Sequence, residues 1–222
     1  MKKMKKINVL PLIALLTWAC LPALGACKTD AGQKGQVAIE DIETPPTRSP
    51  EDDKFADVYK PLDGTWRGKF NIYVHADGQA EGPARPRELD PEAWKSPPFK
   101  LSQTIDVQQV YTSSSPTFQR VAITDTLPDG RVIESVGVNK IQDGRMYCVV
   151  KKPDDLVIHD GATEGPGTIL WSRDRKDPQA VEFFRETVEA DRYTIVGWGY
   201  YGGADTSKAP SYYFQAAYER VQ

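Results

Sequence analysis

Glu182 and Glu186 are a pair of residues whose type and spacing could perform catalysis. They stand four residues apart in a run that alternates apolar and polar residues, so an extended strand would place both carboxyl groups on one face. A pair of carboxyls is the machinery of glycoside hydrolysis. Acidic side chains are far commoner on the wet face of a strand, and Arg185 points the other way. We therefore interpret the two glutamates as surface residues.

The chain has two histidines, His75 and His159. A zinc site takes three or four ligands, and neither histidine has a partner at ligand spacing, so we expect both at the surface and predict no metal or other cofactor. Cys148 lies in an alternating apolar run, without the basic neighbour or helix start that would lower the pKa of its thiol. The sequence predicts that Cys148 is buried and unreactive.

Motifs for nucleophilic or phosphate chemistry are missing from the sequence. It contains no G-x-S-x-G elbow, and the serines at 113–115 precede Pro116 in a segment typical of a turn. The glycine-rich segment 161–167 lacks the lysine of a phosphate-binding loop. We predict no catalytic residue.

Aromatic residues near the C-terminus form a more promising group. Rings that line a cavity beside a few polar groups make a typical small-molecule site, and glycine in a strand marks a bend or the close approach of a ligand. Ordinary core packing is the alternative for any single ring. In a barrel we expect Trp198 and Tyr200 to face inward, and Gly197 and Gly199 outward. The predicted ligand-binding residues are Trp198, Tyr200, Tyr212, Phe214 and Tyr218.

The N-terminal segment has the order of an export signal. Four lysines occupy the first six residues, and an uncharged stretch rich in leucine and isoleucine follows over 7–26. Pro11 and Pro22 count against a retained membrane-spanning helix, because proline inside a helix costs about 3 kcal/mol.

The signal ends in Leu24, Gly25, Ala26 and Cys27, which resembles the lipobox of bacterial lipoproteins. The resemblance implies that cleavage after Ala26 removes residues 1–26 and that Cys27 then carries a diacylglyceryl group and a further acyl chain such as palmitate. More than one chain anchors a protein stably in a membrane. Lys28 stands where an aspartate retains many lipoproteins at the inner membrane, so we expect an outer-membrane anchor, on the periplasmic or the surface face.

Cleavage also changes the charge of the protein. The 28 basic and 31 acidic residues become 24 and 31 when the four signal lysines leave, which gives a net charge near −7. Nucleic-acid binding begins with neutralisation of phosphates, so we predict no nucleic-acid partner. Because Cys20 leaves and Cys27 is alkylated, Cys148 has no cysteine left for an intramolecular disulfide.

Composition divides the mature chain into two parts. Residues 27–57 are polar and proline-rich, and we expect a lipidated cysteine followed by a disordered tether. Residues 58–222 then form one antiparallel β domain with a long loop at 76–98. Period-two alternation and turn signals predict strands at 64–75, 100–112, 117–127, 131–141, 145–151, 155–159, 168–173, 181–189, 192–200 and 211–221.

Short connections and the lack of long amphipathic helices predict an all-β antiparallel meander. The first strand opens with Gly64-Thr65-Trp66, and the last ends with Tyr218-Glu219-Arg220. These ends resemble lipocalins and related small calycin barrels, in which a G-x-W tryptophan closes one barrel end and an arginine lies across its indole. The resemblance implies an up-and-down barrel with Trp66 and Arg220 as the closing pair. A β-sandwich or an open curved sheet is the alternative.

Three classes of function are compatible with this sequence. The first is a membrane-anchored barrel that binds a small apolar or amphipathic ligand or an envelope component. The second is a structural or assembly lipoprotein of the envelope that acts through a protein partner. An enzyme is third, since its polar groups would have to come together from distant strands.

Overall fold

A computed structural model describes residues 37–221 of the chain. The predicted signal peptide, its cleavage site at Ala26 and the lipid attachment site at Cys27 lie outside these residues. The elements in chain order are η1 Pro50–Phe55, η2 Lys60–Leu62, β1 Gly64–His75, η3 Ala93–Lys95, β2 Phe99–Ser115, β3 Phe118–Thr126, β4 Val132–Gln142, β5 Arg145–Lys151, β6 Leu156–Gly165, β7 Thr168–Lys176, β8 Gln179–Glu189, β9 Arg192–Tyr201 and β10 Tyr212–Val221.

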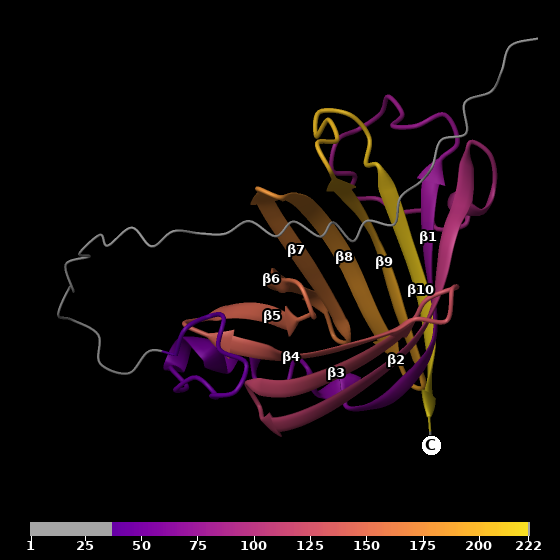
Figure 1. The fold of residues 1–222 in the computed structure, drawn as a ribbon. Coiled ribbons are helices and arrows are strands. Elements are labelled where there is room, and N and C mark those ends of the chain that lie inside the picture. Colours follow the sequence, from indigo (N-terminus) through magenta and orange to yellow (C-terminus); the bar gives the residue numbers. More distant parts are fainter. Residues whose placement is uncertain (1–36, 222) are drawn as a thin grey trace, which may run out of the picture. The chain divides into compact units, whose positions relative to one another are not determined.

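The strands form a closed antiparallel barrel in which each strand pairs with its neighbours in sequence and β10 returns to β1. In Figure 1, β7 to β10 and β1 rise side by side, while β2 to β5 cross in front of their lower ends. The predicted up-and-down barrel is confirmed, and the sandwich and open-sheet alternatives are wrong because closure leaves no free edge. Tight turns make this topology possible. At Asp143 and Gly144 the φ angles are 54° and 67°, as a two-residue hairpin turn requires.

The main core fills one end of the barrel interior. Trp66, Tyr193 and Tyr218 are each 1 % exposed or less and lie within one cluster of buried side chains. Tyr59 and Leu62, from the segment before β1, belong to the same cluster, and the Tyr59 ring stacks on Trp171 with centroids 6.2 Å apart. The segment that contains η2 therefore closes this end of the barrel as a plug.

The predicted disordered tether is wrong over residues 37–57. Ile39 and Ile42 pack on a second apolar cluster on the outer face of β3 to β6. The Lys140 ammonium, buried on the same face, donates to the carbonyl oxygens of Ala38 and Asp41 at 3.0 and 2.8 Å. The polar composition of the segment does not reveal these contacts. Two isoleucines and a few backbone carbonyls are enough to hold the segment against the apolar surface and the buried Lys140 ammonium.

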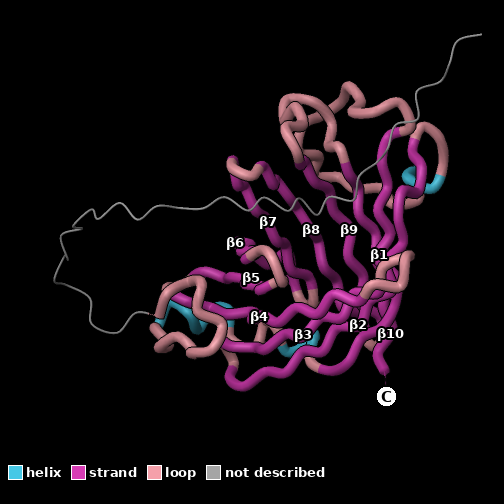
Figure 2. Tube along the Cα trace, viewed as in Figure 1, coloured by secondary structure: helices cyan, strands magenta, loops and turns pink. Residues whose placement is uncertain are grey.

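The long loop at 76–98 packs against the outside of the barrel. Its Trp94 is 4 % exposed and lies between Tyr73 of β1 and Tyr213 of β10, with ring centroids 6.4 and 5.2 Å away. The Gln79 side-chain amide donates to the carbonyls of Asp205 and Ala209, in the loop after β9. The two loops therefore lie together beyond the same end of the sheet (Figure 2).

Within residues 37–221, no helix has the length and apolar character needed to cross a membrane.

Candidate functional site: the barrel interior

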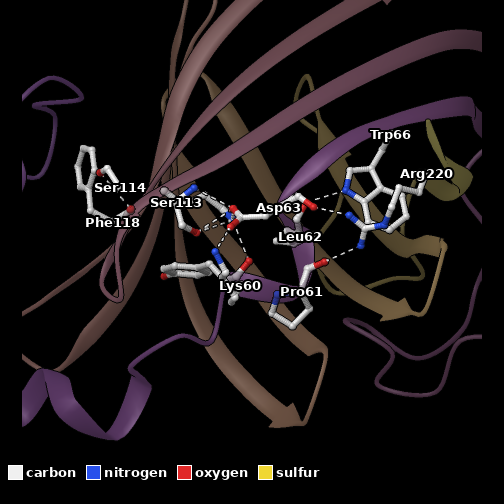
Figure 3. A network of polar contacts seen from close by, with 11 residues as sticks. Lys60, Pro61, Leu62, Asp63, Trp66, Ser113, Ser114, Phe118 and Arg220 are labelled. Atoms are coloured by element: carbon white, nitrogen blue, oxygen red, sulfur yellow. Dashed lines mark hydrogen bonds and ion pairs between the residues drawn. The ribbon is translucent and has the colours of Figure 1, made fainter. Parts of the chain in front are cut away.

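Trp66 and Arg220 lie together at the closed end of the barrel (Figure 3). The guanidinium carbon of Arg220 is 4.1 Å from the centroid of the Trp66 ring, a cation–π contact. Arg220 also donates to the carbonyl oxygens of Asp63 and Pro61, and the Trp66 indole donates to the carbonyl of Leu62 at 2.6 Å. These bonds attach the plug segment to both terminal strands, so any ligand must enter the barrel elsewhere.

Trp198 and Tyr200 face outward, which contradicts the prediction that they line the interior. The Trp198 indole donates to the carbonyl of Pro86 at 2.8 Å, and the Tyr200 hydroxyl donates to the carbonyl of Lys208 at 2.8 Å. Both belong to an outer aromatic cluster with Trp94 and Tyr213. The physical reason is that loops bury the outer face of β9, so large rings are as favourable outside as inside.

Gly197 and Gly199 take the inward positions of β9 instead. A Cβ at Gly197 would lie 2.7 Å from Cδ1 of Phe184, and one at Gly199 would lie 2.6 Å from Cε2 of Tyr201. The two glycines thus leave room for rings that lie flat against the inner wall.

The predicted inward positions on β10 are present. Tyr212, Phe214 and Tyr218 alternate along one face of the strand, and register pairs Phe214 with Ile72 and Tyr218 with Gly68. The Phe214 ring contacts those of Phe70 and Phe184 at 5.6 and 5.4 Å, while Tyr212 contacts Tyr201 at 5.4 Å. Of the five predicted ligand-binding residues, these three share the interior.

The interior is incompletely filled by side chains. A barrel of ten strands is wider than one of eight, whose interior side chains just fill. Several inward-facing residues remain partly exposed although strands surround them, namely Phe70, Ile72, Ile105, Ile123, Cys148, Phe184, Glu186 and Tyr201. The surface that they present is mostly apolar, and the space inside the strands that it faces is called the lumen below.

Glu182 is the centre of a polar cluster on the wall of this lumen. Its Oε2 accepts hydrogen bonds from Arg173 Nε at 2.7 Å and lies 3.0 Å from His159 Nε2, and its Oε1 accepts one from the Tyr201 hydroxyl. Burial would raise the pKa of Glu182, but the bonds and charges of His159 and Arg173 outweigh it and lower the pKa to about 2. Glu182 is therefore an ionised carboxylate whose oxygens are both occupied.

Arg173 retains binding capacity in spite of this ion pair. Its side chain is 10 % exposed, and its Nη1 has no hydrogen-bond partner; the nearest carboxylate oxygen, of Asp155, is 3.7 Å away. Asp155 in turn pairs with Arg175 at 2.9 Å. The cluster thus offers one buried donor, without a net excess of positive charge.

Glu186 faces the same lumen four residues further along β8, in different surroundings. Trp171 and Tyr193 donate hydrogen bonds to its carboxyl group, but within the described part of the chain no cation pairs with it. Burial outweighs the two donors and raises its pKa to about 7. The Cα atoms of Glu182 and Glu186 are roughly 13 Å apart by strand geometry. At this separation the pair does not fit the close carboxyl groups of a glycosidase.

The interpretation of both glutamates and of His159 as surface groups is therefore wrong. The side chains of Glu182 and His159 are 8 % and 12 % exposed. The sequence contained a signal for burial of this face, because Phe184 and Val188 lie on the same face as the two glutamates and apolar residues rarely recur on a solvated face.

Cys148 also faces the interior, where burial raises the pKa of its thiol and makes it a poor nucleophile. His75 lies at the end of β1 against Phe99.

A groove of about 480 Å³ lies on the outer face of β6 to β9, beside the segment Arg85 to Arg87. Phe183 and Trp198 stack within it at 5.8 Å. Its charged groups are largely paired, since Arg85 binds Asp174. The groove and the interior share Arg173 and its unpaired Nη1. The interior is the stronger candidate, because it also contains the unpaired Tyr218 hydroxyl and a group of partly exposed apolar side chains. Among residues 37–221, no three His, Cys, Asp or Glu side chains gather as a metal site.

Comparison with known proteins finds no matching family model and no matching curated protein. Similar solved structures include designed barrels. One is a redesigned β-barrel, mFAP0, bound to DFHBI, with 14 % identity over 72 % of this chain and 99 % of that chain and a TM-score of 0.35. Another is a de novo designed fluorescence-activating β-barrel, with 11 % identity over 74 % and 98 % and a TM-score of 0.35. These values are too low to relate the functions of those barrels to this chain.

Proposed function

We propose that this protein binds a small amphipathic molecule inside its barrel, and that the lipid on Cys27 anchors it to the bacterial outer membrane. The main support for ligand binding is the set of inward-facing side chains that remain partly exposed inside a closed barrel. Most of them are apolar, and a few polar groups interrupt them, which is the usual composition of a small-molecule site.

Buried polar atoms without partners support the same proposal. Arg173 Nη1 and Tyr218 Oη face the interior, and neither has a hydrogen-bond partner in the protein. Leaving such a group unsatisfied costs about 1 to 3 kcal/mol. A ligand that reaches either atom recovers part of this cost, so polar groups on an otherwise apolar ligand would add affinity.

The ligand can be detected by native mass spectrometry of protein purified from its own membranes. We expect a retained small molecule. Ile123→Trp should displace it, because Ile123 is inward and partly exposed, whereas Ala122→Trp on the outward side of the same strand should not. Protein that carries no molecule and also fails to bind the uncharged dye N-phenyl-1-naphthylamine would overturn the proposal.

The anchor rests on the lipobox resemblance and has its own test. We expect Cys27→Ala to abolish partitioning into membranes and Cys20→Ala to leave it intact. Equal retention of both variants would mean that the signal remains as a membrane segment.

A proton-transfer enzyme is the second candidate, and one observation favours it. Glu186 is partly exposed to the lumen and has a pKa near 7, which suits a general acid or base at neutral pH. The test looks for two related molecules in the purified protein that differ by the position of a proton or double bond. If the wild type interconverts them and Glu186→Gln does not, catalysis is favoured over ligand binding alone.

A further inference from the structure

The interior contains a partly exposed carboxyl group on which no cation of the described residues acts. Glu186 points into the lumen from β8, and its registered neighbours are Ile169 on β7 and Ile195 on β9, both apolar. The titratable groups that face it from the surrounding elements are Tyr59 of the plug, Tyr111, Cys148, Tyr193 and Tyr218. Within the described residues, none of these groups is a cation.

We propose, as an extension of the ligand-binding function, that the ligand is an organic cation: an ammonium group with an apolar body, bound with the ammonium against Glu186 among tyrosine rings. A buried carboxylate is stable only when it is paired and hydrogen-bonded. Trp171 and Tyr193 provide the hydrogen bonds, and the ligand provides the positive charge.

The hydroxyl of Tyr218 supports this site independently. The residue is 1 % exposed, its Oη has no hydrogen-bond partner, and it interacts electrostatically with Glu186. An ammonium carries donors and needs acceptors, and the lone pairs of this oxygen are available. Asp125 of β3 also interacts with Tyr218, and burial raises the pKa of this carboxyl group as well, although Lys152 opposes the rise. The interior therefore has acidic groups in excess.

Aromatic rings make the same region favourable for a cation. The ring of Tyr193 contacts those of Trp66, Tyr111 and Tyr218, with centroids 5.5, 6.2 and 5.2 Å away. The faces of such rings attract ammonium groups, by about 2 kcal/mol or more when water is excluded. The rings of Phe70, Phe184 and Phe214 provide apolar surface for the body of the ligand.

Charge argues against an anionic ligand. Arg173 and Arg175 are already paired with Glu182 and Asp155, and Lys152 acts on Asp125 and Cys148 and not on Glu186. An anion beside Glu186 would therefore meet a carboxyl group on which no cation of the described residues acts. The net charge of the mature chain, near −7, also attracts cations from solution.

The test uses benzyltrimethylammonium, whose charge is independent of pH, and neopentylbenzene, its uncharged isostere with carbon in place of nitrogen. Calorimetry on the mature protein should show that the cation binds at least tenfold more tightly than the isostere at pH 8. Its affinity should rise about tenfold between pH 6 and pH 8, because the binding-competent ionised fraction of Glu186 rises by that factor. Binding near pH 7 should release protons, detected as a dependence on buffer ionisation enthalpy.

Glu186→Gln should remove the pH dependence and lower the affinity for the cation at pH 8 at least tenfold. Glu189→Gln, the same change at an exposed position of β8, should leave both unchanged. If the cation and the isostere bind equally and without pH dependence, the proposal of a cationic ligand is wrong, whereas the proposal of an apolar binding site is retained. Failure of both probes and of the uncharged dye would overturn ligand binding itself. If Glu186→Gln fails to fold, proton release by the wild type decides between these outcomes.

Discussion

Glu182 and Glu186 occupy the same face of the same strand, yet the protein treats their carboxyl groups in opposite ways. Around Glu182 the barrel brings together His159 and Arg173, and the pKa falls to about 2 in spite of burial. Around Glu186 it brings together an indole and several phenols, and burial raises the pKa to about 7. The two carboxyl groups are four residues apart on β8, and their pKa values are shifted in opposite directions.

This difference gives Glu182 a structural role and, under the proposed function, leaves Glu186 for a ligand. Both oxygens of Glu182 already have partners in the protein, so the carboxylate fixes the positions of Arg173, His159 and Tyr201. The carboxyl group of Glu186 lacks a counter-charge and is partly exposed to the lumen. Environments that push the pKa values of two similar groups apart commonly mark different tasks.

The largest expected effect is that of Arg173→Met, which removes the guanidinium that pairs with Glu182. Breaking a buried ion pair in this way costs about 3 to 5 kcal/mol, and Arg173 and Glu182 are only 10 % and 8 % exposed. Urea unfolding at pH 7 measures the loss. Arg185→Met, which removes the more exposed pair with Glu164 on the outer face, should cost less than about 1 kcal/mol. Similar losses in both variants would mean that Glu182 is not a buried anchor.

The second effect is a pH dependence that Glu186→Gln removes. Because the folded pKa of Glu186, about 7, lies above its model value of 4.5, the folded state prefers the protonated form. The wild type therefore loses stability as pH rises from about 4.5 to 7, by about 3 kcal/mol from this residue, and the loss is complete above pH 7. Glu186→Gln should be less sensitive over this window in urea unfolding. Parallel profiles of wild type and variant would show that Glu186 ionises normally.

Glu182 contributes stability with the opposite sign. Its folded pKa, about 2, lies below the model value of 4.5, so its contribution is present above pH 4.5 and is lost as pH falls toward 2. The windows of the two glutamates meet near pH 4.5 and hardly overlap. One titration of stability against pH can therefore separate the two regions.

The fold was largely predictable from the sequence because its signals are local. Alternation in 64–75 reproduces the bounds of β1, and turn residues such as Asp143 and Gly144 separate strands that pair in sequence order. The segment 37–57 was misjudged because Ile39 and Ile42 are buried only by strands about a hundred residues away in the sequence.

The site was less predictable because its decisive contacts are not local. Spacing placed Glu182 and Glu186 on one face, but it did not tell which face was inside. His159 and Arg173 reach Glu182 from β6 and β7, 23 and 9 residues earlier in the sequence. For β9, both faces are buried, so the sizes of Trp198 and Gly197 could not assign the inner one.

A third expected effect concerns the Tyr201 hydroxyl, which donates to the ionised Glu182. Hydrogen bonds to charged groups contribute about 1.5 to 3 kcal/mol, so Tyr201→Phe should lower the free energy of unfolding at pH 7 by about 2 kcal/mol. The loss should shrink toward pH 2, where Glu182 becomes protonated. A loss that stays constant with pH would assign it to ring packing against Tyr212 and Phe214 instead.

The smallest effect is expected for Tyr218→Phe, although Tyr218 is the more deeply buried of the two tyrosines. Its hydroxyl has no partner in the protein, so its removal forfeits no hydrogen bond, and the free energy of unfolding should change by less than about 0.5 kcal/mol or rise slightly. The same variant should weaken binding of benzylamine, whose ammonium can donate to that hydroxyl, more than binding of benzyltrimethylammonium, which cannot donate. A stability loss as large as that of Tyr201→Phe would mean that the hydroxyl of Tyr218 already has a hydrogen-bond partner within the fold. The region around Glu186 would then resemble the region around Glu182 in this respect.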